Sequence, residues 1–530
     1  MRKYLLTMAF AAMTLSAYAQ NMYDAYTFSE TTYGGTARSI ALGNAMTAVG
    51  GDLGSLVLNP AGSAVNNYSQ FSITPNISVS SVKSEGEYGF GDRTESSHTR
   101  FNLYNTGFVI NFDNHRSSGI RNVSFGFVAS STANYLSDIY ATGRNGYTSF
   151  MGAMAAGADG YDSSVLNSGE AWYNSNAPWN QILGYKAGMI ATYGGSSNQY
   201  IGATEKLFDN GEIGLAGDID QEFGRFVRGN KTDVLLNLSA NLSDMFYFGG
   251  NIGISSIDYS MDEYIKEAAV NTNDFIINFD DGTTTAFTNS RQRYAYDMEG
   301  SGIYAKAGFI FKPVQSLRIG AAIQTPTAVS VRENYQMDGF TRYTDSKMDA
   351  SAASPSDNEW NYRLVSPFRF NIGFAWTFGN WGFISADYER ADFSSMKLKV
   401  NDDFSSRDYF DDANRDIATY YGHIDALRVG LEIRPTAMWA LRAGYNITTN
   451  PEMYQENGTY NYYDSNKTAL SFGIGYSSRG SFFSDLAFRS TKLPDQYVMP
   501  YADYIDGTLS PEIKSVRRLN DFTLTLGWRF

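Results

Sequence analysis

Residues 521–530 read DFTLTLGWRF, and their side chains alternate between two chemical characters. One face of this stretch is apolar, with Phe522, Leu524, Leu526, Trp528 and Phe530. The other face is small or polar, with Asp521, Thr523, Thr525, Gly527 and Arg529. Because successive side chains of a strand point to opposite faces, the pattern predicts a β-strand with one apolar and one polar face. A strand that crosses a bilayer at a tilt needs about ten residues, and this stretch supplies them.

The apolar face of this strand ends in an aromatic residue at the carboxy terminus. An edge strand of a soluble β-sandwich can alternate as well, but an exposed face that is entirely apolar would be a poor edge. A membrane strand is therefore the better interpretation. The stretch also resembles the signal that the outer-membrane barrel-assembly machinery reads, so we predict that this machinery is a partner. The predicted signal residues are Phe522, Leu524, Leu526, Trp528 and Phe530.

The same alternation recurs upstream, as in residues 368–378, 427–433 and 470–476. Counting such segments gives about fourteen, an even number, as single-chain bacterial barrels require. The predicted fold class is therefore all-β, a transmembrane antiparallel β-barrel of about 14 strands. The predicted strands are 68–82, 100–113, 121–136, 231–242, 244–260, 299–313, 316–333, 361–378, 380–400, 421–434, 436–449, 467–478, 480–492 and 519–530.

Short connections alternate with long ones that are rich in Asp, Asn, Ser, Gly and Tyr. This alternation is typical of a barrel with short periplasmic turns and long extracellular loops. We thus expect a barrel over residues 68–530, whose largest loop is 137–230. A loop of that length without structure is improbable, so it should fold over or into the barrel mouth with helical pieces such as 179–190.

The first nineteen residues read as a signal peptide. Arg2 and Lys3 precede an apolar run from Leu5 to Leu15, and Ala17-Tyr18-Ala19 offers small residues for cleavage. The apolar run is too short for a transmembrane helix, which needs about 20 residues. We predict a signal peptide over 1–19, export, and a multi-pass location in the outer membrane of a Gram-negative bacterium.

Composition excludes several classes of function. The chain has 530 residues, a formal net charge of −14 and a sequence pI near 4.8, which argue against a nucleic-acid partner. With no cysteine there is no disulfide scaffold, thiolate metal site or cysteine nucleophile. The 38 tyrosines and 35 phenylalanines suit the aromatic girdles of a barrel, and the 50 glycines suit tight turns and a crowded lumen.

No motif indicates catalysis or a cofactor. The three histidines, His98, His115 and His423, lie far apart and do not form a metal-binding spacing. No GxSxG nucleophile elbow occurs, and glycine-rich stretches such as 249–251 lie within strands rather than between a strand and a helix. We therefore predict no enzyme activity, no catalytic residue, no metal and no cofactor.

Residues 20–67 are neither signal nor strand. Residues 34–49 are mostly small, which predicts a slim helix in a confined space, and Leu53 to Leu58 offer a second short helix. Asn59-Pro60-Ala61-Gly62 then breaks it, because proline lacks a donor and glycine permits unusual dihedral angles. From the residues alone, two interpretations stay open: a plug inside the barrel, or a leader packed beneath it.

The run from Gly35-Thr36-Ala37-Arg38 through Asn59-Pro60-Ala61-Gly62 resembles the N-terminal hatch of the FadL-like outer-membrane transporters of long-chain fatty acids and aromatic hydrocarbons. The resemblance implies a fourteen-stranded barrel plugged by residues 20–67, with Asn59, Pro60, Ala61 and Gly62 as hatch or gating residues. It also implies passive uptake of hydrophobic molecules and release through the barrel wall at a kink in an early strand. The candidate kink is Ser130-Ser131-Thr132.

The predicted function is therefore passive uptake of hydrophobic small molecules, long-chain fatty acids or similar, gated by the hatch. The expected partners are an apolar ligand and outer-membrane lipids. The alternative is a barrel of the same shape that acts as a surface scaffold or secretion-machinery partner, since its long polar loops would also suit a surface protein partner. Substrate-binding residues are not predicted by any pattern in the chain.

Overall fold

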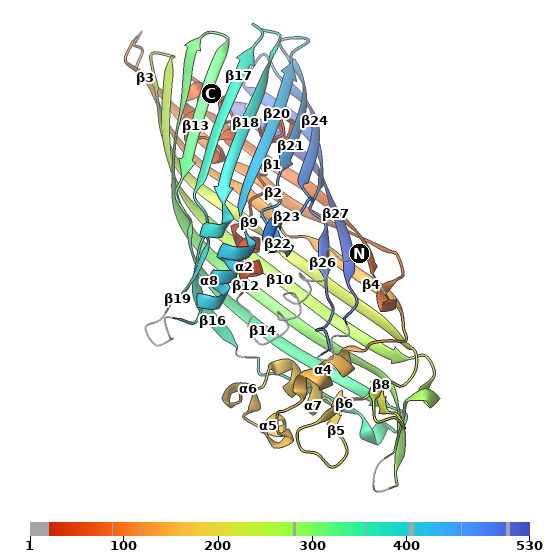
Figure 1. Ribbon diagram of the computed structural model, residues 1–530. Helices are drawn as coiled ribbons and strands as arrows, with labels where there is room; N and C mark the ends of the chain where they lie inside the picture. The colour runs from red at the N-terminus through yellow and green to blue at the C-terminus, as the bar shows by residue number, and fades with distance from the viewer. Residues whose placement is uncertain are drawn as a thin grey trace.

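The computed structural model describes residues 21–86, 88–116, 118–278, 282–356, 358–401, 408–456, 458–504 and 509–530. The predicted signal peptide, 1–19, lies outside these residues. Figure 1 shows one tall barrel with helices inside it and at one end. No helix of the described part is long and apolar enough to cross a membrane.

Fourteen antiparallel strands close the wall of the described barrel, and β1 pairs with β27 to complete the ring. The predicted fold class is confirmed. In ring order the strands are β1 (Gln70–Gly86), β2 (Thr94–Asp113), β3 (Ile120–Asn134), β9 (Ile219–Leu242), β10 (Phe246–Ala269), β12 (Thr284–Val314), β13 (Leu317–Gln324), β17 (Arg369–Thr377), β18 (Gly382–Asp392), β20 (His423–Ile433), β21 (Trp439–Thr448), β24 (Lys467–Ser477), β25 (Phe482–Lys492) and β27 (Ile513–Arg529).

Each strand turns its apolar side chains outward, as the alternation predicted. On β27, Phe522 is 50% exposed, whereas its neighbours Asp521 and Thr523 are fully buried in the lumen. On β17, Phe374 and Trp376 are exposed and Asn371 is buried. Because water cannot enter the hydrocarbon layer, an apolar outer belt around a closed ladder of hydrogen bonds is the arrangement that lipid requires.

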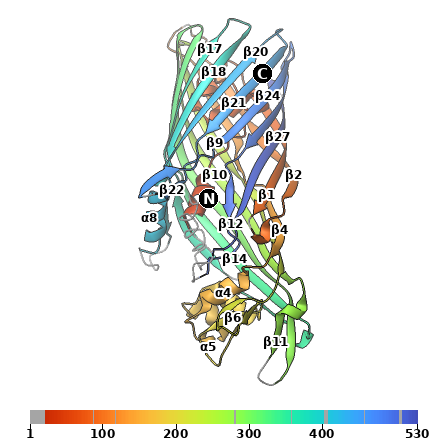
Figure 2. The same ribbon diagram turned by 45° about the vertical axis from the view of Figure 1, so that its right-hand side comes forward.

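The wall is much taller on one side than on the other (Figures 1 and 2). Strands β9, β10 and β12 run on well beyond their predicted ends, and additional strands extend or brace that side. The additional strands are β4 (Ser137–Asn145), β11 (Ile276–Asn278), β14 (Ala328–Tyr343), β15 (Ala350–Ala353), β16 (Glu359–Val365), β19 (Lys397–Val400) and β26 (Gln496–Val498).

Three strands predicted as continuous are interrupted. The predicted strand 380–400 stops at Asp392 and resumes as β19 after a short helical turn, and the other two break at prolines. The predicted strand 316–333 stops at Gln324 and resumes as β14, and the predicted strand 361–378 is split between β16 and β17. Pro326 and Pro367 lie at these breaks. A proline has no N–H to donate to a ladder, so the alternation continues through the sequence while the pairing does not.

The predicted loop 137–230 is shorter than expected, because its two ends pair with each other as β4 and the first part of β9. The remaining insertion, 146–218, folds into short helices and hairpins at the tall end of the barrel (Figure 1). Its elements are α4 (Phe150–Ala158), α5 (Ser163–Asn167), α6 (Ala171–Asn174), α7 (Trp179–Lys186), β5 (Ile190–Thr192), β6 (Tyr200–Gly202), β7 (Glu205–Leu207) and β8 (Ile213–Leu215). The other loops carry η4 (Tyr88–Phe90), η5 (Thr272–Phe275), η6 (Ser346–Met348), η7 (Phe393–Ser395), α8 (Asp411–Tyr420), β22 (Met453–Glu456) and β23 (Thr459–Tyr462).

Residues 21–66 lie inside the barrel and form α2 (Met22–Ser29), α3 (Ala37–Ala41), η2 (Leu53–Val57) and η3 (Pro60–Val65). The helix expected over 34–49 is only five residues long, since the chain turns at Gly43 and Asn44 with positive φ angles. Lumen glycines make room for this segment. A Cβ at Gly249 would lie 2.5 Å from the carbonyl carbon of Pro60, and one at Gly444 would lie 2.1 Å from the nitrogen of Gly43.

Candidate functional site

A cavity of about 1090 Å³ lies at the tall end of the barrel, between the wall, the N-terminal helix α2 and the loops. Its wall side comes from β9, β10, β12 and β14, and its other sides come from the insertion and from the loops near 450–465 and 493–502. The volume lies just above the range that is usual for small-molecule sites. The taller half of the wall thus serves as one side of a chamber that the loops complete.

Tyrosine dominates the lining of this cavity. Among the described residues, fourteen tyrosines line it but only two phenylalanines, Phe150 and Phe223. The rings come from distant parts of the chain and contact one another: Tyr26 stacks on Tyr421 at 5.2 Å, and Tyr135 meets Tyr259 edge to face at 5.4 Å. No sequence pattern marked these residues, because they belong to separate strands and loops that meet only in the fold.

A buried carboxylate fastens the insertion over the mouth of the cavity. Glu267, on β10, accepts hydrogen bonds from the Ser149 hydroxyl at 2.6 Å and from the Phe150 backbone nitrogen at 2.8 Å, at the start of α4. It also accepts one from Gln221 on β9 at 2.6 Å. The loop after β25 joins through Tyr504, which donates to the carbonyl of Ser149 at 2.7 Å. These bonds hold both loops against the wall.

Next to the cavity, the stretch 28–33 of the N-terminal segment, of which Glu30 lines the cavity, is held by four basic side chains from four strands. Lys231 donates to the carbonyl of Phe28 at 3.1 Å, Arg369 to that of Ser29 at 2.8 Å and Arg489 to that of Tyr33 at 2.7 Å. The fourth, Lys467, donates to the Glu30 carboxylate at 2.6 Å. We call Lys231, Arg369, Lys467 and Arg489 the clamp.

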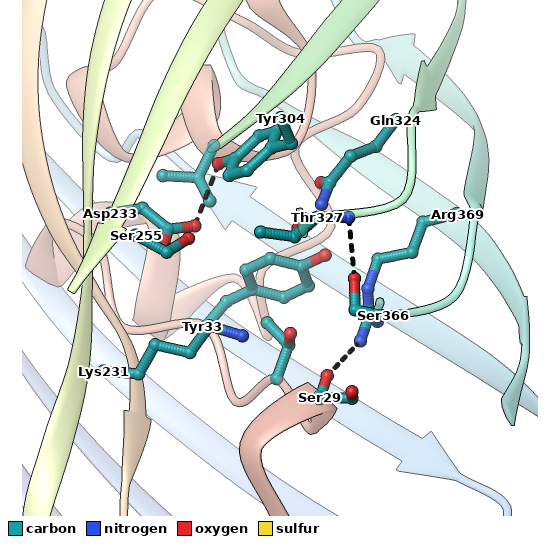
Figure 3. A pocket seen from close by; sticks show the side chains of 12 residues that line it. Ser29, Tyr33, Lys231, Asp233, Ser255, Tyr304, Gln324, Thr327, Ser366 and Arg369 are labelled. Atoms are coloured by element: carbon teal, nitrogen blue, oxygen red, sulfur yellow. Dashed lines mark hydrogen bonds between the residues drawn. The ribbon is translucent and has the colours of Figure 1, made fainter. Parts of the chain in front are cut away.

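Figure 3 shows a small polar pocket around this stretch, where polar side chains of the wall surround Tyr33. Arg369 reaches Ser29, and Tyr304 donates to Asp233 at 2.9 Å. Arg369 also pairs with Glu389 at 2.8 Å, and that carboxylate pairs with Arg428 as well. Buried charges are stable only when they are paired and hydrogen-bonded, and here the N-terminal backbone supplies the carbonyl of Ser29 as a further acceptor for Arg369.

Two carboxylates of the N-terminal segment show how burial acts on this region. Burial and the nearby Glu333 raise the pKa of Asp24 well above its ordinary value, although the Asn21 backbone donates to it. Burial would also raise the pKa of Glu30, but the charge and hydrogen bond of Lys467 outweigh it, so that pKa is lowered. Glu30 is therefore ionised and bonded to the wall at neutral pH.

The predicted gating residues lie at the end of the segment that is farther from the cavity, against the wall. The Asn59 amide donates to the carbonyls of Thr47 at 2.7 Å and Phe309 at 2.9 Å, while its oxygen accepts from the nitrogen of Ala61 at 3.1 Å. Asn237 of β9 donates to the carbonyl of Pro60 at 2.9 Å, and Gly62 accepts from Gly51 at 2.8 Å. These residues hold the segment in place but do not line the cavity.

The candidate kink in the third strand coincides with a break in the wall. The ladder between β2 and β3 ends at Asn105 and Ser130, and the pairing of β3 with β9 shifts register between Ser131 and Ala133. The freed carbonyls of Ser131 and Thr132 accept from the N-terminal segment, from Gly34 at 2.9 Å and Thr32 at 2.7 Å. The kink and the segment are thus joined directly.

Beyond this point β2 and β4 face each other without a continuous ladder. Within the described residues, 94–104 of β2 have no strand pairing on this side. Side chains bridge the two strands instead: Ser96 donates to the carbonyl of Asp138, and Thr94 donates to that of Tyr140. Arg100 reaches further, to the carbonyl of Gly229 on β9 at 3.0 Å. We call the line between residues 94–104 and 131–145 the seam. Tyr135 and Ile139, on its far side, line the cavity.

Four of the predicted barrel-assembly residues lie on β27, and Phe530 follows directly after its end. Of the five, Phe522, Leu524, Trp528 and Phe530 are exposed on the outer face, and Leu526 is half-buried. Their role in assembly stays a prediction. In the described part of the chain, no group of three or more His, Asp or Glu residues could hold a metal ion.

Comparison with known proteins identifies the fold. The structure is similar to the crystal structure of the Pseudomonas putida toluene transporter TodX, with a TM-score of 0.52 at 13% identity over 94% of this chain and 99% of that one. It is also similar to a Pseudomonas aeruginosa FadL homologue, with a TM-score of 0.50 at 13% identity over 94% and 98%. No family model matches the sequence, and no curated protein matches it. The predicted FadL-like barrel is therefore confirmed as a fold.

Proposed function

We propose that this protein is an outer-membrane channel for the passive uptake of hydrophobic small molecules, long-chain fatty acids or similar, with residues 20–67 as its hatch. The observation that carries the proposal is the cavity of about 1090 Å³ that is bounded by α2 and by Glu30, the residue to which Lys467 of the clamp donates. A ligand that leaves water for this cavity gains about 25 cal/mol for each Å² of apolar surface removed from solvent. Capture needs no covalent chemistry.

The seam is the proposed exit. Between the cavity and the far end of the barrel, the lumen is filled by the N-terminal segment and by ion pairs of the wall. An apolar molecule that moved along the barrel axis would therefore have to displace buried charges. The seam instead lies beside Tyr135, which lines the cavity, and the outward residues Phe101 and Leu103 are exposed next to it. An apolar ligand that passes there enters lipid rather than water.

The proposed gate is the contact between the segment and the kink. Thr32 and Gly34 donate to the carbonyls at the kink, and the same stretch is held by the clamp. A ligand that displaces residues 28–34 would release these carbonyls and loosen the seam. Binding would therefore favour opening only to the extent that the ligand binds the displaced form more tightly.

The alternative is a scaffold or secretion-machinery partner without transport. The two functions place different demands on the barrel: a scaffold needs a loop surface for its partner, whereas a transporter needs a chamber for its ligand. The chamber of this barrel lies between the wall, α2 and the loops and is lined by aromatic rings, which supports transport.

Native mass spectrometry of the detergent-purified barrel, combined with lipid extraction, tests the proposal. We expect a stoichiometric apolar or amphipathic molecule, or saturable binding of an added long-chain fatty acid. A barrel that is empty and binds neither fatty acids nor hydrocarbons on titration would overturn uptake and leave the scaffold.

A further inference from the structure

The aromatic residues of this protein are divided between two environments. Phenylalanine is frequent on the lipid-facing side of the strands, as with Phe125, Phe374 and Phe472, whereas tyrosine surrounds the cavity. The two rings bury similar apolar area, and they differ in the hydroxyl group. A chamber for plain hydrocarbons would gain nothing from fourteen hydroxyls, each of which needs a hydrogen-bond partner when it is desolvated.

Two of these hydroxyls have no hydrogen-bond partner among the described residues. Tyr421, which is 1% exposed, and Tyr135, which is 7% exposed, both line the cavity, and neither hydroxyl has a hydrogen-bond partner in the described structure. Asp24, on α2, also lines the cavity, and no basic side chain of the described residues lies within 4.0 Å of its carboxylate. Buried hydroxyls are otherwise satisfied in folded proteins, so these atoms are available to a ligand.

Arg517, on β27, is the most informative of the lining residues. It is 7% exposed, and its Nη2 donates to the carbonyl of Asn134 at 3.0 Å. Its Nε has no hydrogen-bond partner, and within the described part of the chain no carboxylate lies within 4.0 Å of the guanidinium. The nearby Glu30 is already bonded to Lys467. A buried guanidinium without a carboxylate is rare, because the charge is costly to desolvate, and its planar group fits a carboxylate or another oxyanion.

Resting on the uptake function proposed above, we infer that the ligand is not a plain hydrocarbon but a hydroxylated, ring-bearing amphiphile with one anionic group. Its rings pack among the tyrosines, its hydroxyls bond to groups such as Tyr421, Tyr135 and Asp24, and its oxyanion binds Arg517. A site that is built to hydrogen-bond its ligand discriminates against an analogue without those groups, since its own polar atoms are then left unpaired.

The test uses three probes on one skeleton: biphenyl, hydroxybiphenyl and hydroxybiphenyl carboxylate. Affinities are measured by native mass spectrometry or fluorescence with the full-length barrel in detergent. We expect affinity to rise about tenfold with the hydroxyl and about tenfold or more again with the carboxylate. Arg517→Gln should abolish the carboxylate gain and leave the hydroxyl gain, Arg517→Lys should restore part of the carboxylate gain, and Tyr421→Phe should reduce only the hydroxyl gain.

Arg390→Gln is the matched control, because Arg390 is exposed and pairs with Asp425 away from the cavity. If Arg517→Gln does not fold, the probe series on the unaltered protein and on Tyr421→Phe still decides the matter. Biphenyl binding as tightly as its derivatives, or a carboxylate gain that survives Arg517→Gln, would overturn the inference and leave uptake intact. If no probe, fatty acid or hydrocarbon binds, both proposals fail.

Discussion

The side chain of Asn59 joins three parts of the molecule: the turn at Thr47, the start of η3 and the wall at Phe309. Asn59→Ala removes these bonds and leaves buried carbonyls without donors. We expect the local free energy of unfolding of residues 47–61 to fall by about 2 kcal/mol, since each buried group left unpaired is costly. Hydrogen exchange of this stretch measures the effect.

Asn361→Ala serves as the control, because Asn361 lies exposed on β16 and its side-chain amide donates to Glu359, far from residues 47–61. It should leave exchange at 47–61 unchanged. Equal protection in Asn59→Ala and in the unaltered protein would show that Asn59 does not anchor the segment.

Glu30 gives the clamp a pH dependence. Its pKa is lowered from 4.5, because Lys467, Arg517 and Arg369 outweigh the effect of burial. A carboxylate whose pKa is lowered on folding stabilises the folded state above its unfolded pKa, and this contribution is lost as the pH falls through the lowered value. Protection of residues 28–33 against hydrogen exchange should therefore be constant near neutral pH and decrease below about 4.5.

Glu30→Gln should remove the part of this acid transition that belongs to the tether to Lys467. Asp52 provides a contrast of opposite sign within the same segment, because burial raises its pKa and protonation then favours the folded form. A transition that is identical in Glu30→Gln and in the unaltered protein would assign the pH dependence to other groups.

At the scale of elements, removal of the N-terminal segment is the most informative test of whether this segment gates the channel. Deleting residues 21–58 from the exported chain leaves the clamp without its carbonyl partners, but water that enters the lumen can solvate the charges. We expect a folded, heat-modifiable barrel with a larger single-channel conductance than the full chain. Failure of the deleted chain to assemble would mean that the segment is structural, and the gating idea would lose its support.

The strands could be predicted from the alternation of apolar and polar residues wherever one face of the strand contacts lipid. The alternation in 521–530 reappears as outward Phe522 and inward Asp521, because a lipid-facing position tolerates only apolar side chains. The parts of β9 and β12 at the tall end of the barrel, residues 219–230 and 284–298, were not predicted as strands because they extend beyond the apolar belt. There, both faces can be polar, as at Arg225 and Arg293, and the alternation disappears.

The site was less predictable than the fold. The resemblance of residues 35–62 pointed to a segment that lies inside the barrel, and its role as a hatch stays a prediction. The interruption at Ser130–Thr132 coincides with the end of the ladder between β2 and β3. The cavity was not predicted, since Tyr26, Tyr135 and Tyr421 lie far apart in the sequence and are brought together only by the closed barrel. Arg517 was not predicted either, because an arginine in a strand becomes informative only when the structure shows that no carboxylate pairs with it.

The whole molecule is a closed ring of strands with one line, the seam, along which strand pairing is interrupted. Every neighbouring pair of the fourteen described strands shares a ladder, but along the seam the ladder of β2 gives way to side-chain bridges. The cavity, the N-terminal segment and the seam meet at Thr32, Gly34 and Tyr135. The central claim is that ligand travels from the cavity into lipid along this line, while the lumen stays closed.

A reversible lock on the seam tests this claim most directly. The chain has no cysteine, so Ser96→Cys with Asp138→Cys introduces one cysteine pair where the Ser96 side chain already reaches Asp138. Asn111→Cys with Ser124→Cys, within the continuous ladder of β2 and β3, is the control. Uptake of a labelled long-chain fatty acid is measured in oxidised and reduced samples of each. The account predicts that oxidation stops uptake only in the seam variant and that reduction restores it, whereas equal uptake by its oxidised and reduced forms would contradict the account.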